Sequence, residues 1–198
     1  MTDLAAPLGA IDTGFDGPIG PSMSTFSSEY MTHIEAALDE DDAQVPDRIL
    51  ALLRSTDLLV QSFQVTQLGH GLQTATMAER AGADVDMVVA SLCHDMGKFI
   101  SNANHPAIAA EIIRPWVSDE AYWVVKVHQD FEGMHYYDRM GLDPMMRRRH
   151  ADHPYYDLAE RFADAWDQHA FDPDYPTLPL EHFEPMVREV FGTPPRRG

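Results

Sequence analysis

The chain has 198 residues, 44% of them hydrophobic, which is enough to build the core of one domain. Its 32 acidic and 14 basic residues give a formal charge of −18, and a surface this negative repels phosphate backbones, so we expect no nucleic-acid partner. No stretch approaches the roughly 18 apolar residues of a membrane span, and residues 1–20 lack the basic start and apolar core of a secretion signal.

The single cysteine, Cys93, excludes a disulfide within the chain and is typical of a reducing compartment. Together with the missing membrane span and signal, it predicts a cytoplasmic protein that does not associate with membranes. A basic run, Arg147-Arg148-Arg149, could bind a phosphate or a carboxylate. Consecutive arginines point around a helix in different directions, however, so we interpret the run as a solvated face.

Residues 1–45 are rich in Gly, Pro, Ser and Asp, and only Ser28 to Leu38 shows a helical pattern. Such a composition buries little apolar area, so it predicts a flexible acidic arm with one short helix. The composition of the sequence changes at Val45. Residues 46–198 are predicted to form the folded domain.

The domain begins with a helix at Pro46, since proline is tolerated in the first turn. A second helix, Leu68–Ala81, ends at Gly82, and Asp84 caps a third that runs to about Gly97. Further helices are predicted over Pro106–Arg114, Asp119–Phe131, Pro144–His150, Tyr155–Phe171 and Leu180–Phe191, with a proline-bearing loop, 171–179, between the last two. Almost nothing alternates with the period of two that strands require, so the predicted fold class is all-α.

His94 and Asp95 are adjacent at the end of the third helix, whose segment Met87–Cys93 is apolar on every side. An aspartate in such a place is costly to bury unless it is paired or binds a metal. Neighbouring side chains on a helix diverge by about 100°, so the two cannot chelate one ion in the way of an i, i+4 pair. The imidazole could instead bind one metal while the carboxylate bridges to a second.

Three other histidines are candidates for the same site. His70 precedes His94 by 24 residues, and His105 and His128 follow it in the next two predicted helices. A single histidine on a half-apolar helix is usually a core residue, and His128 taken alone has that interpretation. Histidine nitrogen combined with carboxylate oxygen suits iron, manganese or zinc.

These residues resemble the HD superfamily of helical metal-dependent enzymes. Its pattern is a histidine, then His-Asp followed by x-Gly-Lys, then a late aspartate; here these are His70, the run His94–Lys98 and Asp167, which follows Trp166 and is preferred over Asp164. The resemblance covers about residues 55–191. It implies a compact helical bundle with a dinuclear metal site in its centre.

Two additional histidines between the His-Asp pair and the last aspartate are typical of the diiron oxygenase branch of that superfamily, which includes myo-inositol oxygenase and an aminophosphonate-cleaving oxygenase. His105 and His128 fill these positions. The resemblance implies two iron ions, O2 as co-substrate, and cleavage of a C–C or C–P bond in a hydroxyl-bearing small molecule. It further implies that one iron is held by His70, His94, Asp95 and Asp167, and the other by His105 and His128 with Asp95 as the bridge.

Two residues, Asp95 and Lys98, are the candidate catalytic residues. Lys98 matches a substrate-contacting lysine of the inositol-cleaving enzyme, but many HD hydrolases also have lysine there. The lid residues of the phosphonate-cleaving enzyme are not conserved in this chain, which has Val60 and Phe63 in their places. The resemblance therefore does not imply that this chain acts on the substrate of that enzyme.

Two other classes of function stay open. The first is a phosphohydrolase that uses Mn, Mg or Zn on a phosphate ester or nucleotide. Six ligands also suit the cyclic-dinucleotide phosphodiesterases of the superfamily, but their Gly-Tyr-Pro is missing after His128. The second is a non-catalytic, metal-stabilised binding module. Candidates for the mouth of a pocket, or for an exposed aromatic surface, are His135, Tyr136, Tyr137, His150, His153, Tyr155 and Tyr156. Candidates for side chains just behind the ligands are His153 and His169.

Overall fold

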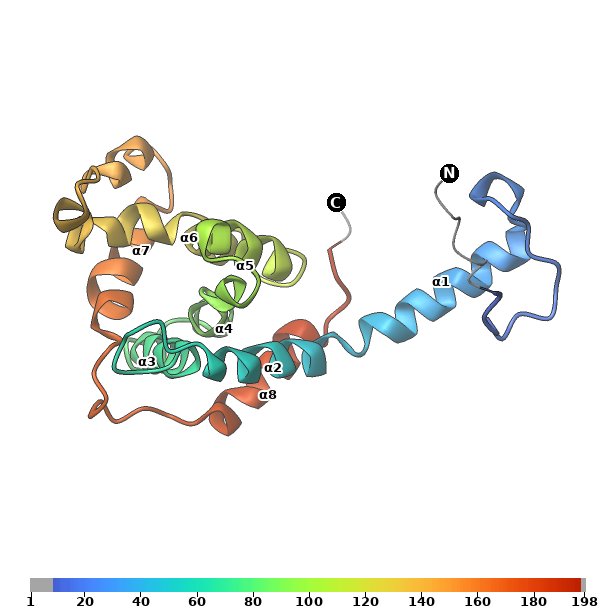
Figure 1. The fold of residues 1–198 in the computed structure, drawn as a ribbon, viewed down its shortest axis with the longest axis horizontal. Coiled ribbons are helices and arrows are strands. Elements are labelled where there is room, and N and C mark those ends of the chain that lie inside the picture. Colours follow the sequence, from blue (N-terminus) through green and yellow to red (C-terminus); the bar gives the residue numbers. More distant parts are fainter. Residues whose placement is uncertain (1–8, 197–198) are drawn as a thin grey trace, which may run out of the picture. The chain divides into compact units, whose positions relative to one another are not determined.

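The computed structural model of the protein describes residues 9–196 and divides the chain into two compact units, Met1–Ala43 and Gln44–Gly198 (Figure 1). No strand occurs among residues 9–196, which confirms the predicted all-α fold. No helix in the same range is long and apolar enough to cross a lipid bilayer.

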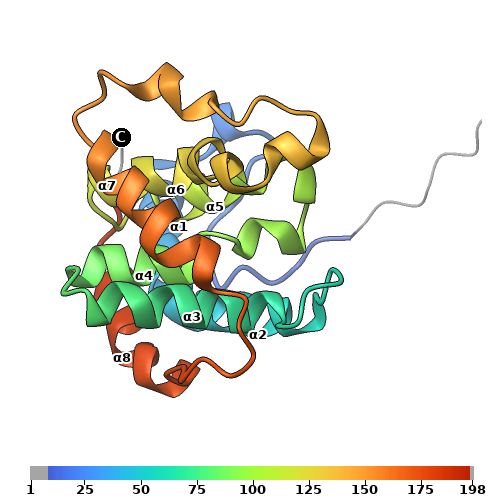
Figure 2. The same ribbon diagram turned by 90° about the vertical axis from the view of Figure 1, so that its left-hand side faces the viewer.

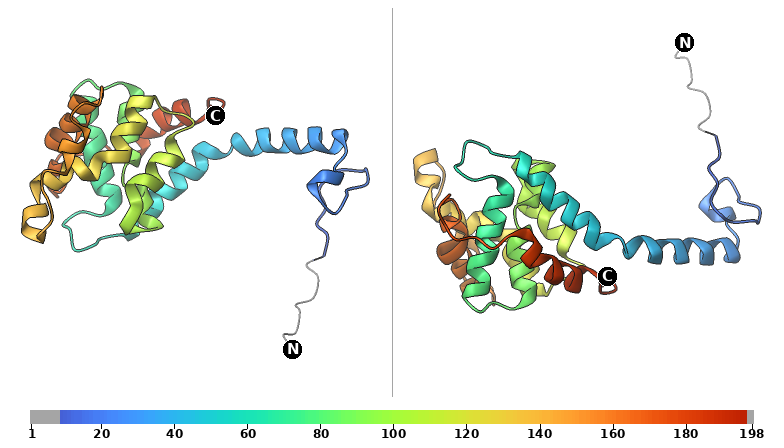
Figure 3. Two further views of the ribbon diagram at one scale, coloured as in Figure 1. Left: turned by 90° about the horizontal axis from the view of Figure 1, so that it is seen from above. Right: turned by 90° about the horizontal axis from the view of Figure 1, so that it is seen from below.

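The first unit contains one helix of regular length, α1 (Ser28–Asp42), which follows a 3-10 turn at Met23–Thr25. Figure 3 shows α1 as one continuous helix. Ser27 caps it by accepting a hydrogen bond from the backbone N–H of Tyr30, and the ring of Tyr30 lies 5.0 Å from that of Phe26. None of residues 9–43 is buried, so the described part of this unit has no hydrophobic core.

The second unit is a bundle of helices. Its α-helices are α2 (Val45–Ser55), α3 (Gln67–Arg80), α4 (Val85–Cys93), α5 (His105–Ile113), α6 (Asp119–Glu132), α7 (Tyr156–Arg161) and α8 (Leu180–Phe191). Side-chain caps define where several of them begin: the oxygens of Thr66, Asp84 and Ser118 accept hydrogen bonds from backbone N–H groups in the first turns of α3, α4 and α6. These starts agree with the helix signals in the sequence.

Helix α4 is the centre of this unit (Figures 1 and 2). It packs against α3, α5, α6 and α8, and every residue from Met87 to Cys93 is buried. A helix that is apolar on all sides can be stable only when other elements cover all of it. The end of α4, where the His-Asp pair lies, is therefore brought into the interior of the bundle.

The predicted helix Tyr155–Phe171 is divided into three parts. The α-helix α7 ends at Arg161, a π-helical turn covers Phe162–Trp166, and a 3-10 turn covers Asp167–His169. A π turn inserts an extra residue into the helical repeat and so shifts the side chains that follow it. The orientation of Asp167 depends on this irregularity, which hydrophobic periodicity does not reveal.

Two smaller expectations were wrong. The predicted helix Pro144–His150 is a 3-10 helix over Met146–His150. Arg147 does not lie on a solvated face: it is 5% exposed and pairs with Asp164 at 3.0 Å and with Glu160 at 3.4 Å. The two acidic partners compensate the buried guanidinium, so this arginine connects the 3-10 helix to α7 and the π turn.

Candidate metal centre

The six predicted ligands come together from five segments of the chain. His70 lies on α3, His94 and Asp95 follow α4, His105 begins α5, His128 lies one turn before the end of α6, and Asp167 begins the 3-10 turn after the π turn. None of the six residues is more than 4% exposed. Buried polar groups at this density require compensation by one another or by a bound ion.

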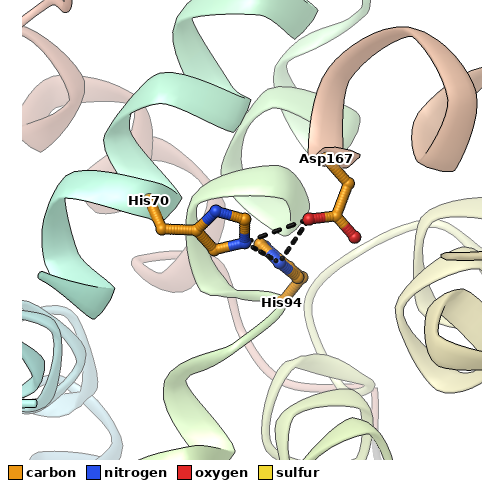
Figure 4. Close-up of side chains that lie close together, drawn as sticks. All are labelled: His70, His94 and Asp167. Carbon is orange, nitrogen blue, oxygen red and sulfur yellow. Dashed lines mark hydrogen bonds and ion pairs between the residues drawn. The ribbon is translucent and has the colours of Figure 1, made fainter. Parts of the chain in front are cut away.

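The first group consists of His70, His94 and Asp167 (Figure 4). The Nε2 atoms of the two histidines are 3.1 Å apart. Oδ1 of Asp167 lies 3.0 Å from Nε2 of His70 and 3.4 Å from Nε2 of His94. Two nitrogens and one oxygen from three separate segments thus point at one small space.

The second group consists of His105 and His128, whose Nε2 atoms are 3.3 Å apart. Oδ1 of Asp95 faces this pair, at 3.0 Å from His105 and 3.5 Å from His128. Oδ2 of the same aspartate faces the first group, at 3.4 Å from His70 and 3.5 Å from His94. Asp95 therefore lies between the two histidine pairs with one oxygen toward each.

The four imidazole rings are oriented by the same kind of hydrogen bond. In each ring Nδ1 lies within hydrogen-bonding distance of a backbone carbonyl, which requires Nδ1 to be the protonated nitrogen. The four contacts are His70 to Ala170 (3.0 Å), His94 to Ser91 (2.8 Å), His105 to Asn102 (2.9 Å) and His128 to Val125 (2.7 Å). In the neutral rings every Nε2 therefore presents a lone pair to the interior, as a metal ligand does.

In this cluster of six side chains, hydrogen-bond acceptors therefore face other acceptors. Oδ1 of Asp95 and both carboxylate oxygens of Asp167 are buried without a hydrogen-bond partner, although imidazole nitrogens lie about them. Lone pairs this close repel one another unless a cation lies between them. A set of four imidazole nitrogens and two carboxylates fits divalent iron, manganese or zinc.

The pKa values of the ionisable side chains in the site reflect how close these groups lie to one another. Burial disfavours the charged form of His94, but the Asp95 and Asp167 carboxylates raise the pKa of His94 to about 9. Burial would raise the pKa of Asp95, but the neighbouring His94 and Lys98 hold the pKa of this carboxyl well below its usual range. A metal-free site would thus retain a proton on His94 in place of a cation.

Lys98 lies three residues after Asp95, and its ammonium group contacts Oδ2 of that carboxylate. Burial opposes the charge of Lys98, but the Asp95 carboxylate outweighs this effect and raises the pKa of the lysine. The Lys98 side chain also lines a cavity of about 910 Å³ beside the candidate metal ligands. A positive charge is therefore held where the cluster meets the cavity.

The cavity accounts for part of the predicted pocket mouth. His135, Tyr136 and Tyr137 line it, and His105 is the cluster residue that it reaches. Its wall also includes Gln61 and Phe63 from the loop between α2 and α3. The cavity therefore leads from this surface loop to the second histidine pair.

Other sequence candidates lie elsewhere. His150 bonds to Asp130 (2.8 Å), and His153 stacks on Trp123 with ring centroids 3.7 Å apart. His169 is exposed, so neither it nor His153 supports a ligand. Asp164 bonds to His135 (2.7 Å) and to Arg147, outside the cluster. Tyr155 and Tyr156 also lie outside the cavity wall.

One residue of the site was missed in the sequence. Glu132 lies on the cavity wall, and burial, followed by repulsion from the Asp167 and Asp95 carboxylates, raises its pKa well above the usual range. The available signal was its position four residues after His128 in one helix, which places both side chains on one face.

A family comparison agrees with this geometry. The model of the HD domain matches residues 68–172, a span that begins just before His70 and ends just after Asp167. The chain belongs to the HD-domain family. HD domains bind divalent metals, and the members of this family are in general metal-dependent enzymes. Comparison with curated proteins finds no significant match to this HD domain.

Proposed function

We propose that this HD domain is a diiron oxygenase that uses O2 to cleave a C–C or C–P bond in a hydroxyl-bearing small molecule, such as a polyol or a hydroxylated phosphonate. The supporting observation is the division of four inward Nε2 atoms into two pairs, one facing each oxygen of Asp95. Two nitrogen pairs joined by one carboxylate provide places for two ions. The second pair, His105 and His128, is the feature shared with the oxygenase branch.

In this proposal the chain contributes a buried site whose ligands are already in place before metal binds. Bound iron would supply the redox chemistry that activates O2. Each imidazole is already oriented by its Nδ1 hydrogen bond, so little reorganisation is needed when metal binds. None of the six ligand side chains is more than 4% exposed, and the cavity adjoins the centre at His105.

Lys98 is the proposed substrate-orienting residue. Its ammonium group uses one donor on Asp95 and lies on the cavity wall, so further N–H donors are available to a substrate. An anionic or polyol substrate would accept a charge-assisted hydrogen bond there. The ion pair with Asp95 keeps the ammonium group close to the metals without making it a ligand.

A phosphohydrolase is the second candidate. The same two-ion arrangement could polarise a phosphoryl oxygen and activate a water molecule. Lys98 favours this candidate as well, since a cation beside two metal ions suits a phosphate ester. In that case Mn, Mg or Zn would replace iron.

The metal and the consumed co-substrate distinguish the two candidates. Protein purified in air would be analysed for iron, manganese and zinc and by optical spectroscopy. The iron-loaded chain would then be offered hydroxylated phosphonates, polyols and phosphate esters, with oxygen uptake and phosphate release followed together. We expect substrate-dependent oxygen uptake; phosphate release without oxygen consumption would reject the oxygenase and support the hydrolase.

The partners proposed for this chain are accordingly a small-molecule substrate and O2, without nucleic acid or membrane. The formal charge of −18 supports the exclusion of nucleic acid. We propose a cytoplasmic location on the basis of the single buried thiol, Cys93, which is typical of a reducing compartment.

A further inference from the structure

Glu132 lies one helical turn after His128 on α6, on the wall of the cavity. Residues four apart on a helix share a face, so the carboxylate and the imidazole are neighbours. Single ligand atoms of His128, Glu132 and Asp167 all lie within 4.8 Å of one another. A third carboxylate therefore borders the cluster of six ligands at the place where the cavity reaches it.

Within the described residues no side chain or backbone group pairs with this carboxylate. Among residues 9–196 Glu132 makes no hydrogen bond and no ion pair, while the nearby ammonium group of Lys98 is engaged with Asp95. Asp167 beside it is 1% exposed, and both of its oxygens lack a hydrogen-bond partner. Unpartnered carboxylates in one enclosed place repel each other unless they share a proton or a cation.

Without Glu132, the second group offers fewer ligand atoms than the first. The first group can draw on His70, His94, Asp167 and Oδ2 of Asp95. The second group has only His105, His128 and Oδ1 of Asp95 among the six predicted ligands. This smaller group is the one adjoining the cavity through His105, and Glu132 reaches it through its helix neighbour His128.

We infer that Glu132 is a ligand of the second metal ion, which it binds from the cavity side together with His105, His128 and Asp95. The inference rests on the two-metal centre of the proposed function and not on which reaction that centre performs. It has a direct consequence for charge. A third carboxylate lowers the residual positive charge of the dinuclear centre by one unit relative to the six predicted ligands.

The test uses the full chain loaded with Co²⁺, whose optical spectrum reports the ligands of the ion. Four proteins would be compared: wild type, Glu132→Gln, Glu132→His and Glu120→Gln. Glu120→Gln is the matched control, because Glu120 is an exposed glutamate on the same helix and its replacement removes the same charge. Each protein would be dialysed against graded concentrations of a competing chelator, and bound metal would be measured per chain.

We expect two ions in the wild type and in Glu120→Gln. In Glu132→Gln the second ion should bind at least about tenfold more weakly, with a changed Co²⁺ spectrum, while the first ion is retained. Glu132→His offers a different donor atom at the same place and should recover part of the lost affinity. Its circular dichroism also shows whether replacement of Glu132 is tolerated by the fold.

Three outcomes separate this inference from the proposed function. If Glu132→Gln and Glu132→His both hold two ions with wild-type affinity and spectrum, Glu132 is not a ligand and the inference is overturned. If the wild type holds one ion, the inference and the two-metal function both fail. If the second ion depends on Glu132 but the iron-loaded wild type consumes no oxygen, the inference holds and the oxygenase is rejected.

Discussion

Gly97 lies directly against the backbone of His105. A Cβ atom added at Gly97 would be 2.3 Å from the carbonyl oxygen of His105 and 3.0 Å from its Cα. His105 is the first residue of α5, and Gly97 belongs to the 3-10 turn that follows Asp95. The missing side chain lets α5 start close enough for Nε2 of His105 to lie 3.0 Å from Oδ1 of Asp95.

Gly97→Ala should therefore damage the metal centre through the backbone. Something must shift to relieve the clash, and a carbonyl oxygen cannot rotate away as a side chain does. We expect a loss of about 1–3 kcal/mol in the free energy of unfolding, with weaker binding of the second ion. Denaturant unfolding and metal analysis would measure both. Gly69→Ala is the control, because its Cβ would meet nothing closer than 3.4 Å; equal effects in the two variants would contradict this explanation.

Asp95→Ala should remove more metal than any single histidine variant. The oxygens of Asp95 face both histidine pairs, so its loss would leave two cations close together with less negative charge between them. We expect both ions to be lost or greatly weakened, whereas His105→Ala should lose mainly the second. Elemental analysis of the two purified variants makes the comparison. Retention of both ions by Asp95→Ala would exclude a bridging role.

Lys98→Ala should keep both metals and impair substrate use. The ammonium group cannot ligate a cation, and its place on the cavity wall allows a charge-assisted hydrogen bond to a substrate. Loss of this hydrogen bond should weaken substrate binding by roughly 1.5–3 kcal/mol, which corresponds to about tenfold to a hundredfold in KM or in kcat/KM. The metal content and spectrum serve as internal controls. Unchanged kinetics with a substrate identified by screening would leave Lys98 with a structural role beside Asp95.

Metal binding should release protons below about pH 9. The pKa of His94 is raised to about 9 in the metal-free site, so its Nε2 is protonated at neutral pH and the proton must leave before a metal can bind. Apparent affinity should rise with pH by up to about tenfold per unit until pH 9 and then level off. Calorimetric titration at pH 7 in two buffers of different ionisation enthalpy would count the protons. Binding heats that are independent of the buffer would contradict the expectation.

The same shift predicts how the metal-free chain responds to pH. His94 has a higher pKa in the folded state than the ordinary value of 6.5, so the folded state binds its proton more tightly. The stabilisation from this group is complete below about pH 6.5 and is lost as pH rises toward 9. Chelator-treated protein should therefore melt at a lower temperature at pH 9 than at pH 6.5. Metal-loaded protein should not show this contribution, because the metal takes the place of the proton.

Residues 1–45 are predicted to be a flexible arm, and limited proteolysis tests this boundary. None of residues 9–43 is buried, so local unfolding there exposes little apolar surface and costs little free energy. A protease of broad specificity should cut before Val45 first and leave a stable fragment that begins near Pro46. Mass spectrometry of the fragments would locate the cuts. Cleavage within 46–198 while the arm stays intact would show that the arm packs as a structural element.

Local patterns in the sequence were sufficient for most helices and for the His94–Asp95 pair, whereas the other predicted ligands came from the resemblance to the HD superfamily. Helix α8 was predicted with its observed bounds, Leu180–Phe191, because proline and an amphipathic repeat mark it clearly. His94 and Asp95 stood out because a polar pair after an all-apolar helix is costly without a partner. Each of these signals is contained in a short stretch of neighbouring residues, which is the range over which a single sequence is informative.

The tertiary structure decided what depends on elements far apart in the chain. The preference for Asp167 over Asp164 was already made from the family pattern, but the π turn at Phe162–Trp166 and the pairing of Asp164 with Arg147 and His135 appear only in the folded chain. Arg147 looked like a surface residue because the acidic partners that compensate its burial come from a different segment. Glu132 looked like an ordinary polar helix position because its carboxylate matters only when α6 brings it beside Asp167. Burial and electrostatic pairing are properties of packed neighbours, and those neighbours exist only after the chain has folded.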